Sequence, residues 1–263
     1  PGTDAERLLR ASLLLAAGQA GPAEADLRAL SSESAPARAL REMMAMVRNE
    51  QPEPLSPPGT ASEWMARSYS LQARSELSEA LAAARAAAGK SPQFGAAWIR
   101  VAELEFSFGR TPEALTALEK GLELSPRQAQ GLALKGFLLA ARKDNSQALE
   151  YFDRAVAADG ALGYAWLGRG LIKIRQGQGI EGRADLQVAA MLEPQRSILR
   201  SYLGKAFSHT RDTTRAEKEL ALARKLDPND PTGWLYSALL NEQQNRVNEA
   251  VRDLEKSKEL NDN

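Results

Sequence analysis

The four tryptophans of this chain share one spacing, and that spacing constrains the fold more than any other feature. Trp64, Trp98, Trp166 and Trp234 are separated by 34, 68 and 68 residues, so all four are in phase on a 34-residue period. Fixed periods of about 20 to 50 residues are typical of repeat architectures. We therefore divide residues 61–263 into six units of that length, which start at 61, 95, 129, 163, 197 and 231.

The six units agree in side-chain size at several positions. Position 8 is small in every unit: Ser68, Ala102, Gly136, Gly170, Gly204 and Ala238. Position 20 is always Ala or Gly: Ala80, Ala114, Ala148, Gly182, Ala216 and Ala250. Positions 4, 8 and 11 share one helical face, as do positions 20, 24 and 27. Each unit is therefore predicted to be two antiparallel helices that approach closely where the small residues meet.

The end of each unit and the composition support the same fold. Position 32 is Pro in four of the six units, and Pro ends a helix because it cannot continue one. The chain is rich in Ala, Leu, Arg and Glu, which are good helix formers. One helix pair cannot bury its apolar face alone, whereas stacked neighbours bury it together. We expect an all-α protein.

The motif of the second unit resembles the tetratricopeptide repeat. The resemblance lies in Trp98, Val101, Ala102, Gly109, Ala114, Leu118 and Pro126, and the units that begin at 163 and 231 carry similar residues. It covers 61–263 without a gap. It implies a right-handed α-solenoid, a superhelix of antiparallel helix pairs with a 34-residue period. Two departures affect local packing: Arg200 stands at position 4, and position 11 is polar in Glu105, Lys173 and Asn241.

Residues 1–50 are predicted to form N-terminal helices outside the six units. A degenerate repeat-like pair is expected over about 4–30, since Gly18, Ala23 and Leu27 would fall at positions 15, 20 and 24. An extra helix is expected over about 36–49. Residues 51–60 contain four prolines and are predicted to be an extended linker. The alternative for this segment is a Pro-rich ligand for another domain.

Composition excludes several classes of function. The formal net charge is zero, which argues against nucleic acid as a partner because phosphate binding needs excess positive charge. The chain has no Cys and one His, so thiolate chemistry, iron–sulfur clusters and mechanisms with two histidines are ruled out. No uncharged apolar run approaches the about 18 residues of a membrane-spanning helix. We predict no enzyme activity, no cofactor, no metal and no direct membrane insertion.

Three short motifs resemble functional sites, and each is better explained by the repeat. The glycines of 177–182 match a dinucleotide-binding pattern, but they fall on the predicted turn and helix-packing positions rather than after a strand. Residues 227–238 resemble a calcium loop with its glycine misplaced. Ser208, His209 and Asp212 are too close on one helix to be oriented as a catalytic set. We interpret all three as structural.

The resemblance implies a binding groove along the first helix of each unit. In that family, positions 2, 5, 6, 9, 12 and 13 commonly face the groove. The predicted groove residues are Tyr69, Arg100, Phe106, Phe137, Tyr164, Leu171, Arg175, Tyr202, Lys205, His209, Tyr236 and Leu239. Aromatic residues and Arg carry much of the energy of protein interfaces. The alternative is that some of these side chains pack between repeats. The asparagines and lysines of the chaperone-binding subclass are missing from positions 5 and 9, which disfavours that subclass.

Charge is unevenly distributed along the repeats. Residues 163–225 carry twelve Lys and Arg against six Asp and Glu, whereas 226–263 carry four against eight. This is either ordinary surface variation or a sign of an acidic ligand near the fourth and fifth units. Rim charges act mainly on association rates, so an acidic ligand would make association salt-dependent.

The sequence therefore predicts a non-catalytic scaffold that binds another protein or peptide. The alternatives are a regulatory or substrate-recruiting module of a larger enzyme or cell-envelope assembly, and a module that self-associates through its last repeat. Pro1 is not a natural start and no capping helix follows the sixth unit. We therefore expect a longer natural protein or a homo-oligomer. The Ala- and Arg-rich repeats resemble bacterial envelope proteins, which favours the periplasmic side over the cytoplasm and leaves both open.

Overall fold

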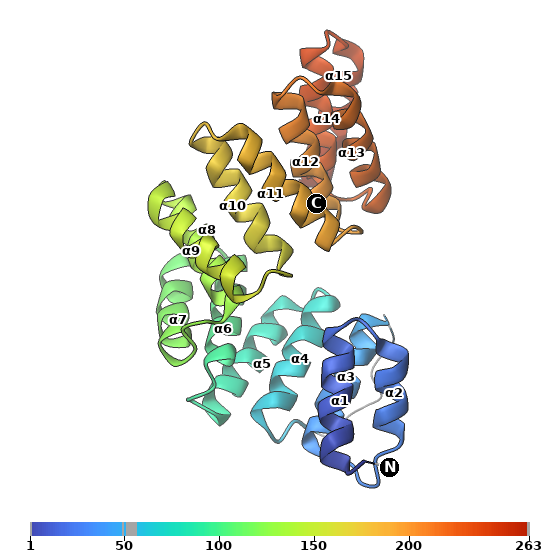
Figure 1. Cartoon of the computed structure of the whole chain (residues 1–263), viewed down its shortest axis with the longest axis vertical. Coiled ribbons are helices and arrows are strands. Elements are labelled where there is room, and N and C mark those ends of the chain that lie inside the picture. The colour runs from blue at the N-terminus through green and yellow to red at the C-terminus, as the bar shows by residue number, and fades with distance from the viewer. Residues whose placement is uncertain (1, 49, 51–56, 262–263) are drawn as a thin grey trace. The chain divides into compact units, whose positions relative to one another are not determined.

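The structure is a computed structural model that describes residues 2–48, 50 and 57–261 (Figure 1). All regular secondary structure in these residues is α-helical, in fifteen helices. Residues 51–56, which contain two of the four prolines of the predicted linker, lie outside the described residues.

Three helices precede the repeats, and twelve helices form the six pairs. The first three are α1 (Asp4–Ala16), α2 (Ala20–Arg28) and α3 (Ala35–Val47). The first helices of the pairs are α4 (Ala61–Ala73), α6 (Gly95–Ser107), α8 (Ala129–Ala141), α10 (Gly163–Arg175), α12 (Ser197–His209) and α14 (Pro231–Gln243). The second helices are α5 (Leu77–Lys90), α7 (Thr111–Leu124), α9 (Asn145–Ala158), α11 (Gly179–Leu192), α13 (Thr213–Leu226) and α15 (Val247–Asn261). The six first helices thus begin 34 residues apart.

The turn inside each pair has the same backbone geometry. Position 15 adopts a left-handed conformation in all six units, at Ser75, Gly109, Lys143, Gly177, Arg211 and Asn245. The next residue donates its N–H to the carbonyl of position 11, as Arg110 does to Glu105 at 2.9 Å. This is the six-residue hydrogen bond that closes a helix C-terminus. Gly18 has a φ of 73° and is followed by the equivalent bond from Gln19 to Leu14, so the N-terminal pair shares this turn.

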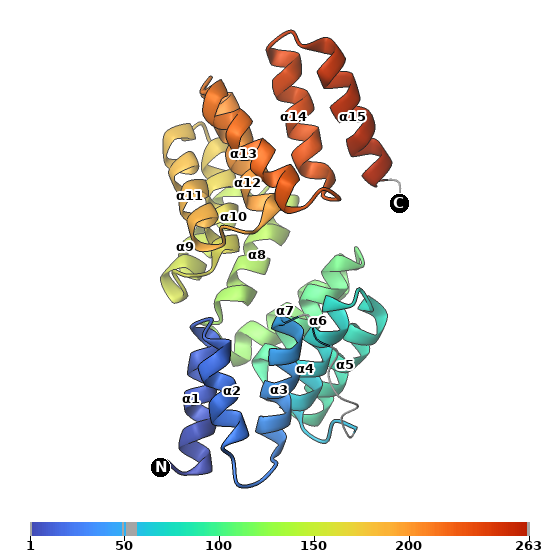
Figure 2. The ribbon, with the colours of Figure 1, turned by 90° about the vertical axis from the view of Figure 1, so that its right-hand side faces the viewer.

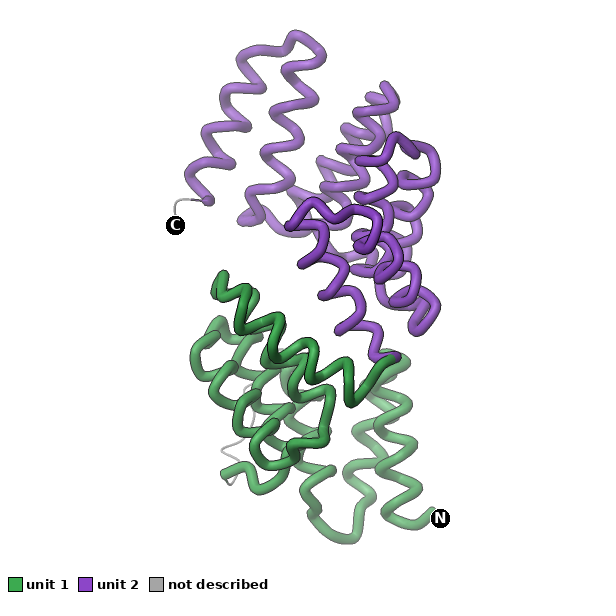
Figure 3. Tube along the Cα trace, turned by 90° about the vertical axis from the view of Figure 1, so that its left-hand side faces the viewer, with its two compact units in different colours: residues 1–126 green, residues 127–263 purple. Residues whose placement is uncertain are grey.

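The six 34-residue units, called repeats below, are divided between two compact parts of the chain. These parts are unit 1, residues 1–126, and unit 2, residues 127–263 (Figure 3). The 34-residue period alone does not indicate this division. Unit 1 contains α1 to α7 and unit 2 contains α8 to α15. Within each unit, consecutive helices pack against one another, which makes each unit a stack of helix pairs and a helical-repeat solenoid (Figure 2).

The helices of a pair approach closely where the sequence has small residues. The Ser68 hydroxyl at position 8 donates to the carbonyl of Ala80 at position 20, at 2.9 Å. A Cβ added to Gly170 would lie 2.7 Å from the Gly182 carbonyl oxygen, and one added to Gly182 would lie 2.6 Å from that of Gly170. Both glycines are needed because no side-chain carbon fits at such distances.

Phe152 occupies more space than the leucine found at the same position in most other repeats. Its ring is fully buried, and a Cβ on Gly136 or Gly168 would lie 2.8 Å or 2.1 Å from ring atoms. Two glycines, one on α8 and one on α10, therefore accommodate a single large side chain on α9.

Arg200 replaces the position-4 tryptophan without losing its hydrogen bond. The indole nitrogens of Trp98, Trp166 and Trp234 each donate to the carbonyl six residues earlier, at 2.9 to 3.0 Å. The Arg200 Nε donates to the Pro194 carbonyl in the same way, at 3.3 Å, and its guanidinium pairs with Glu219 at 3.1 Å. The substitution therefore preserves the contact between adjacent repeats.

The polar residues at position 11 are paired rather than misplaced. Glu105 is 1% exposed and is bridged by the guanidinium groups of Arg85 and Arg110. Lys173 pairs with Asp185 at 2.8 Å. Asn241 donates to Asp253 at 2.9 Å, in the sixth unit. Buried charges cost little when they are paired and hydrogen-bonded, so the fold tolerates these departures.

The N-terminal helices join the repeats of unit 1 through buried carboxylates. Ala11, Ala23 and Leu27 form the core between α1 and α2. Between α3 and α4, Arg38 pairs with Glu63 and Arg67 with Glu42, each at 2.6 Å. Both carboxylates are buried. The extra helix therefore continues the stack.

Candidate functional site

Six of the predicted groove residues line one hollow of unit 2. The hollow has a volume of about 290 Å³ and lies among α10, α12 and α14. Its lining residues are Leu171, Ile174, Arg175, Tyr202, Lys205, Ala206, His209 and Tyr236. All of them lie on the first helices of three successive repeats.

The spacing of the first helices explains where the hollow forms. α12 packs directly against α14, and a Cβ on Gly233 would lie only 3.3 Å from the Ser201 Oγ. α10 and α12 make no contact of comparable extent. The larger side chains Leu171 and Tyr202 line the hollow there. Small residues thus close one interface, while larger ones border an open space at the next.

An aromatic pair and a lysine form one wall of the hollow. The Tyr202 and Tyr236 rings meet edge to face, with centroids 5.5 Å apart. The Lys205 Nζ lies 4.6 Å from the centre of the Tyr236 ring and 3.4 Å from its hydroxyl oxygen. The three side chains hold one another in place, because edge-to-face and cation–π contacts both have preferred geometries.

The charges in the hollow are all positive. Burial, together with the neighbouring Arg175 guanidinium, lowers the pKa of Lys205 below its usual value. Burial is also the main cause that raises the pKa of Tyr236, with smaller contributions from Tyr202 and Asp230. No carboxylate is among the residues that line the hollow. Asp230 is the acid that acts on Tyr236, and its oxygens already accept hydrogen bonds from Ser197 and Thr232. The hollow therefore favours an anionic group.

The other predicted groove residues of unit 2 lie outside this hollow. Phe137 packs edge to face on buried Phe152, with centroids 4.9 Å apart, and lies 6.3 Å from Tyr164. Arg196 stacks on the Tyr164 ring and donates to its hydroxyl at 2.8 Å. Leu239 is 41% exposed on α14. Phe137 thus contributes to packing, and Leu239 is accessible.

Two of the three predicted groove residues of unit 1, Arg100 and Tyr69, form a filled site. Arg100 is 3% exposed and stacks on the Tyr69 ring at 4.0 Å. Its guanidinium donates to the Ser68 hydroxyl at 3.0 Å and to Gln72 at 2.7 Å, and it pairs with Glu103 at 3.2 Å. Phe106 is half-buried on α6. The charge of Arg100 is therefore satisfied by neighbouring groups of unit 1.

Some site residues were not in the predicted set. Ile174 and Ala206 line the hollow. Ile174 stands at position 12, which belongs to the predicted groove face, so the repeat numbering could have identified it. Arg196 caps Tyr164 from the loop before α12, and the groove positions of the repeat do not include that loop.

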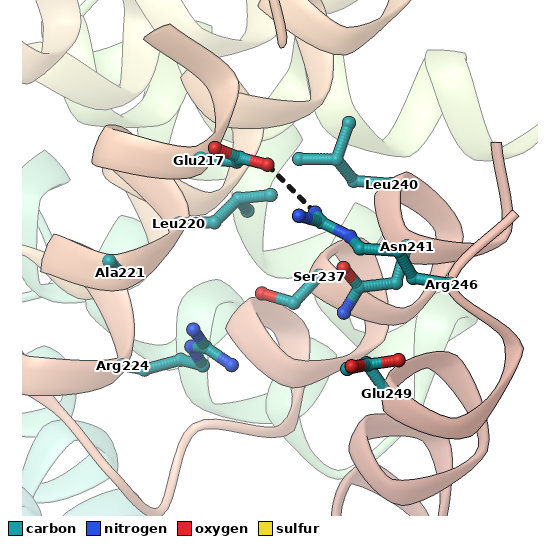
Figure 4. A pocket seen from close by; sticks show the side chains of 9 residues that line it. All are labelled: Glu217, Leu220, Ala221, Arg224, Ser237, Leu240, Asn241, Arg246 and Glu249. Atoms are coloured by element: carbon teal, nitrogen blue, oxygen red, sulfur yellow. Dashed lines mark hydrogen bonds and ion pairs between the residues drawn. The ribbon is translucent and has the colours of Figure 1, made fainter. Parts of the chain in front are cut away.

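A second cavity of unit 2, of about 330 Å³, lies beside α13 (Figure 4). It is lined by residues of α13, α14 and the start of α15, and its charged groups are largely paired. Arg246 pairs with Glu217 at 2.7 Å, and Arg224 reaches Asp253 at 3.4 Å. We interpret it as a gap between adjacent repeats.

The short motifs have structural roles. Gly182 packs on Gly170, Asp227 accepts from the Asn229 N–H at 3.0 Å, and Asp212 caps α13. The Ser208 hydroxyl donates to Gln243 rather than to His209. In the described ranges, no helix has the length and apolarity to cross a membrane, and no cluster of three potential metal ligands occurs.

Comparison with known proteins agrees with the architecture. The sequence model of the tetratricopeptide repeat matches residues 65–129. Superkiller complex protein 3 of Mus musculus is 29% identical over 134 residues, which is 50% of this chain and 9% of that protein. The chain therefore spans only a small part of this curated relative.

Solved structures share the fold at low identity. One chain of the Cut9–Hcn1 hetero-tetramer superposes with a TM-score of 0.78 and 17% identity, over 97% of this chain and 53% of that chain. A tetratricopeptide-repeat protein of Parabacteroides merdae gives 0.59 and 17%, over 98% and 93%. The type IV pilus biogenesis factor PilW gives 0.61 and 18%, over 73% and 90%. Residues 65–129 thus match the tetratricopeptide repeat, and the 34-residue helix pairs of the chain share the fold of these solved structures.

Proposed function

We propose that this chain is a non-catalytic scaffold whose first helices bind a segment of a partner protein. The observation that carries the proposal is the hollow among α10, α12 and α14, lined by Leu171, Tyr202, Lys205 and Tyr236 among others. Three successive repeats contribute to it. An extended or helical segment could therefore contact several repeats at once.

The chemistry of the hollow supports a protein ligand. Aromatic and Arg side chains dominate the energetics of protein interfaces, and the hollow has two tyrosines and Arg175. Ser208 and Asp212, the residues closest to a catalytic arrangement, are engaged in hydrogen bonds of helix ends and neighbouring helices. The Cut9–Hcn1 structure, which shares the fold, is a hetero-tetramer. A role in assembling proteins is consistent with this likeness.

Site-specific photo-crosslinking tests the proposal. A photoreactive amino acid is placed at His209, which is exposed at the hollow, and separately at Lys218, which is exposed on second helix α13. Each variant is expressed in the organism that encodes the chain. We expect partner adducts from His209 and none from Lys218. Adducts of equal yield from both positions, or from Lys218 alone, would contradict binding at the first helices.

The exposed apolar side chains of the last pair favour self-association as a second candidate. Val247, Val251 and Leu254 on α15 are 50 to 60% exposed, and Leu235 and Leu239 on α14 are 37 and 41% exposed. Contiguous exposed apolar surface often marks an interaction site. Light scattering of the chain and of a Val251→Glu/Leu254→Glu variant tests this. A wild-type chain that stays monomeric at millimolar concentration would eliminate the candidate.

A further inference from the structure

We infer that the hollow of unit 2 binds side-chain carboxylates of an acidic segment within the partner protein. The inference rests on the proposed function, and it specifies the chemistry of the partner. The recognising groups are the Arg175 guanidinium, the Lys205 ammonium and the hydroxyl and ring of Tyr236.

Four half-buried cations elsewhere in unit 2 have ion-pair partners. Arg169 and Lys173 share Asp185, each at 2.8 Å. Arg200 pairs with Glu219 and Arg224 with Asp253. Arg175 and Lys205, in contrast, have no ion-pair partner anywhere in the described part of the chain. The two cations that line the hollow are thus left for an external anion.

The charged form of Lys205 is electrostatically unfavourable in the free protein. Its ammonium is half-buried, and both burial and Arg175 disfavour its charged form. Its hydrogen bond to the Tyr236 hydroxyl uses one of its three protons. A bound carboxylate would accept from the remaining donors and offset the repulsion between the two cations. Charge-assisted hydrogen bonds of this kind are stronger than neutral ones.

The positions of the donors constrain the shape of the ligand. Lys205 and His209 are four residues apart, so they lie one turn apart on the same face of α12, and Arg175 approaches from α10. Donors spread over two helices suit a stretch with more than one carboxylate, rather than a single chain terminus. Leu171 and Ile174 add an apolar wall. The expected ligand therefore combines Asp or Glu with a neighbouring apolar residue.

The surrounding repeats carry an excess of positive charge. Residues 163–225 have a net excess of six positive charges, although the whole chain is neutral. Such local excess steers an oppositely charged partner toward the site and makes association sensitive to salt.

The test is a selection of peptides from a random twelve-residue display library against the full chain. Selected peptides are synthesised with amidated C-termini, so that only side chains supply carboxylates, and in a second form with free C-termini. Affinities are measured by fluorescence anisotropy at low and at high salt. We expect enrichment of Asp and Glu, equal affinity of both forms, and an affinity that falls as salt rises.

Paired variants locate the binding. Arg175→Gln/Lys205→Met removes the two cations of the hollow, and Lys218→Gln/Lys225→Met removes two exposed cations of α13. Circular dichroism checks that both remain helical. We expect the first variant to bind the selected peptides at least about tenfold more weakly, which corresponds to about 1.4 kcal/mol, and the second to bind as the wild type does.

The outcomes separate this inference from the proposed function. Peptides without acidic enrichment that still compete at the hollow would overturn the inference and leave the scaffold function standing. Acidic peptides that bind both variants equally would also overturn it. Peptides that need a free C-terminus would replace side-chain recognition with terminal recognition. A selection that yields no binder would count against the proposed function itself.

Discussion

The Arg100 site of unit 1 and the Lys205 hollow of unit 2 combine a cation with a tyrosine on first helices, but only the first is filled. Arg100 stacks on Tyr69 at 4.0 Å, and Lys205 lies over Tyr236 at 4.6 Å. Around Arg100, a serine, a glutamine and Glu103 complete the hydrogen bonds. Around Lys205, the lining side chains include a second cation and no acid.

The difference teaches that equivalent surfaces of a repeat can serve stability in one place and binding in another. A cation whose charge and hydrogen bonds are satisfied by neighbouring side chains contributes to the packing around it. A cation that is partly desolvated and lacks an acid is a cost in the free protein, and an anionic ligand can offset that cost. Perturbed ionisable groups are common at functional sites for this reason.

The largest expected effect is on the filled site. Arg100→Met would leave Glu103 and the Ser68 carbonyl without their donor, and removing one partner of a buried polar set costs about 2–3 kcal/mol. The free energy of unfolding is measured by urea titration. Lys205→Met is the matched substitution in unit 2, and we expect a change within about 0.5 kcal/mol. A loss of similar size in both variants would remove the distinction between the two sites.

A second prediction closes the open site. Leu171→Glu places a carboxylate in the hollow at position 9, the position that Glu103 occupies in its own unit. The new carboxylate should compete with an acidic ligand, and we expect the selected peptides to bind at least about tenfold more weakly, or about 1.4 kcal/mol. Ile180→Glu on α11, at a side chain 71% exposed, is the control and should leave the affinity unchanged.

A third prediction uses the pH dependence of the filled site. Burial raises the pKa of Glu103, with the Arg100 charge acting in the opposite direction. A carboxyl whose folded-state pKa is raised adds stability below its unfolded pKa and loses it as pH rises through the folded value. The wild-type free energy of unfolding, minus that of Glu103→Gln, should therefore fall as pH rises from about 4. A difference that increases with pH would mean that Arg100 outweighs burial.

The smallest effect concerns pH and binding at the open site. The pKa of Lys205 is lowered, and the ionisable groups that face it are Arg175, His209, Tyr202 and Tyr236. Only the charged ammonium attracts a carboxylate, so affinity for acidic peptides should fall as pH rises. The midpoint of this fall should lie below pH 10.5, the usual lysine pKa. Titration by anisotropy from pH 7 to 10.5 measures this, with Lys205→Met as the variant expected to lack the transition. A wild-type midpoint at or above pH 10.5 would contradict the lowered pKa of Lys205.

Self-similarity within the sequence predicted the architecture because close packing fixes residue size at each contact. Small residues at positions 8 and 20 allow the helices to meet, as Gly170 and Gly182 do. The polar position-11 residues were harder to interpret. Their partners include Arg85 of the preceding unit for Glu105 and Asp185, twelve residues beyond Lys173, and the repeat motif does not specify these residues.

The candidate site was predictable only as a face. The family resemblance implies that positions 6 and 9 face the groove, so the sequence identifies Arg100 and Lys205 as equivalent candidates. Whether such a side chain is enclosed depends on neighbours from other helices. Ser68 and Gln72 of α4 enclose Arg100, whereas Lys205 meets the Tyr236 hydroxyl of α14 and the like charge of Arg175 from α10.

The sequence by itself determined the helix pairs and their 34-residue spacing, because these follow from helix-forming preferences and from residue size at each helix contact. Only the tertiary structure decided which cations are paired, which first helices separate to form a hollow, and how Gly136 and Gly168 accommodate Phe152. Those features depend on contacts between particular side chains, many of them in different helices, and a periodic pattern repeats positions without specifying such pairs.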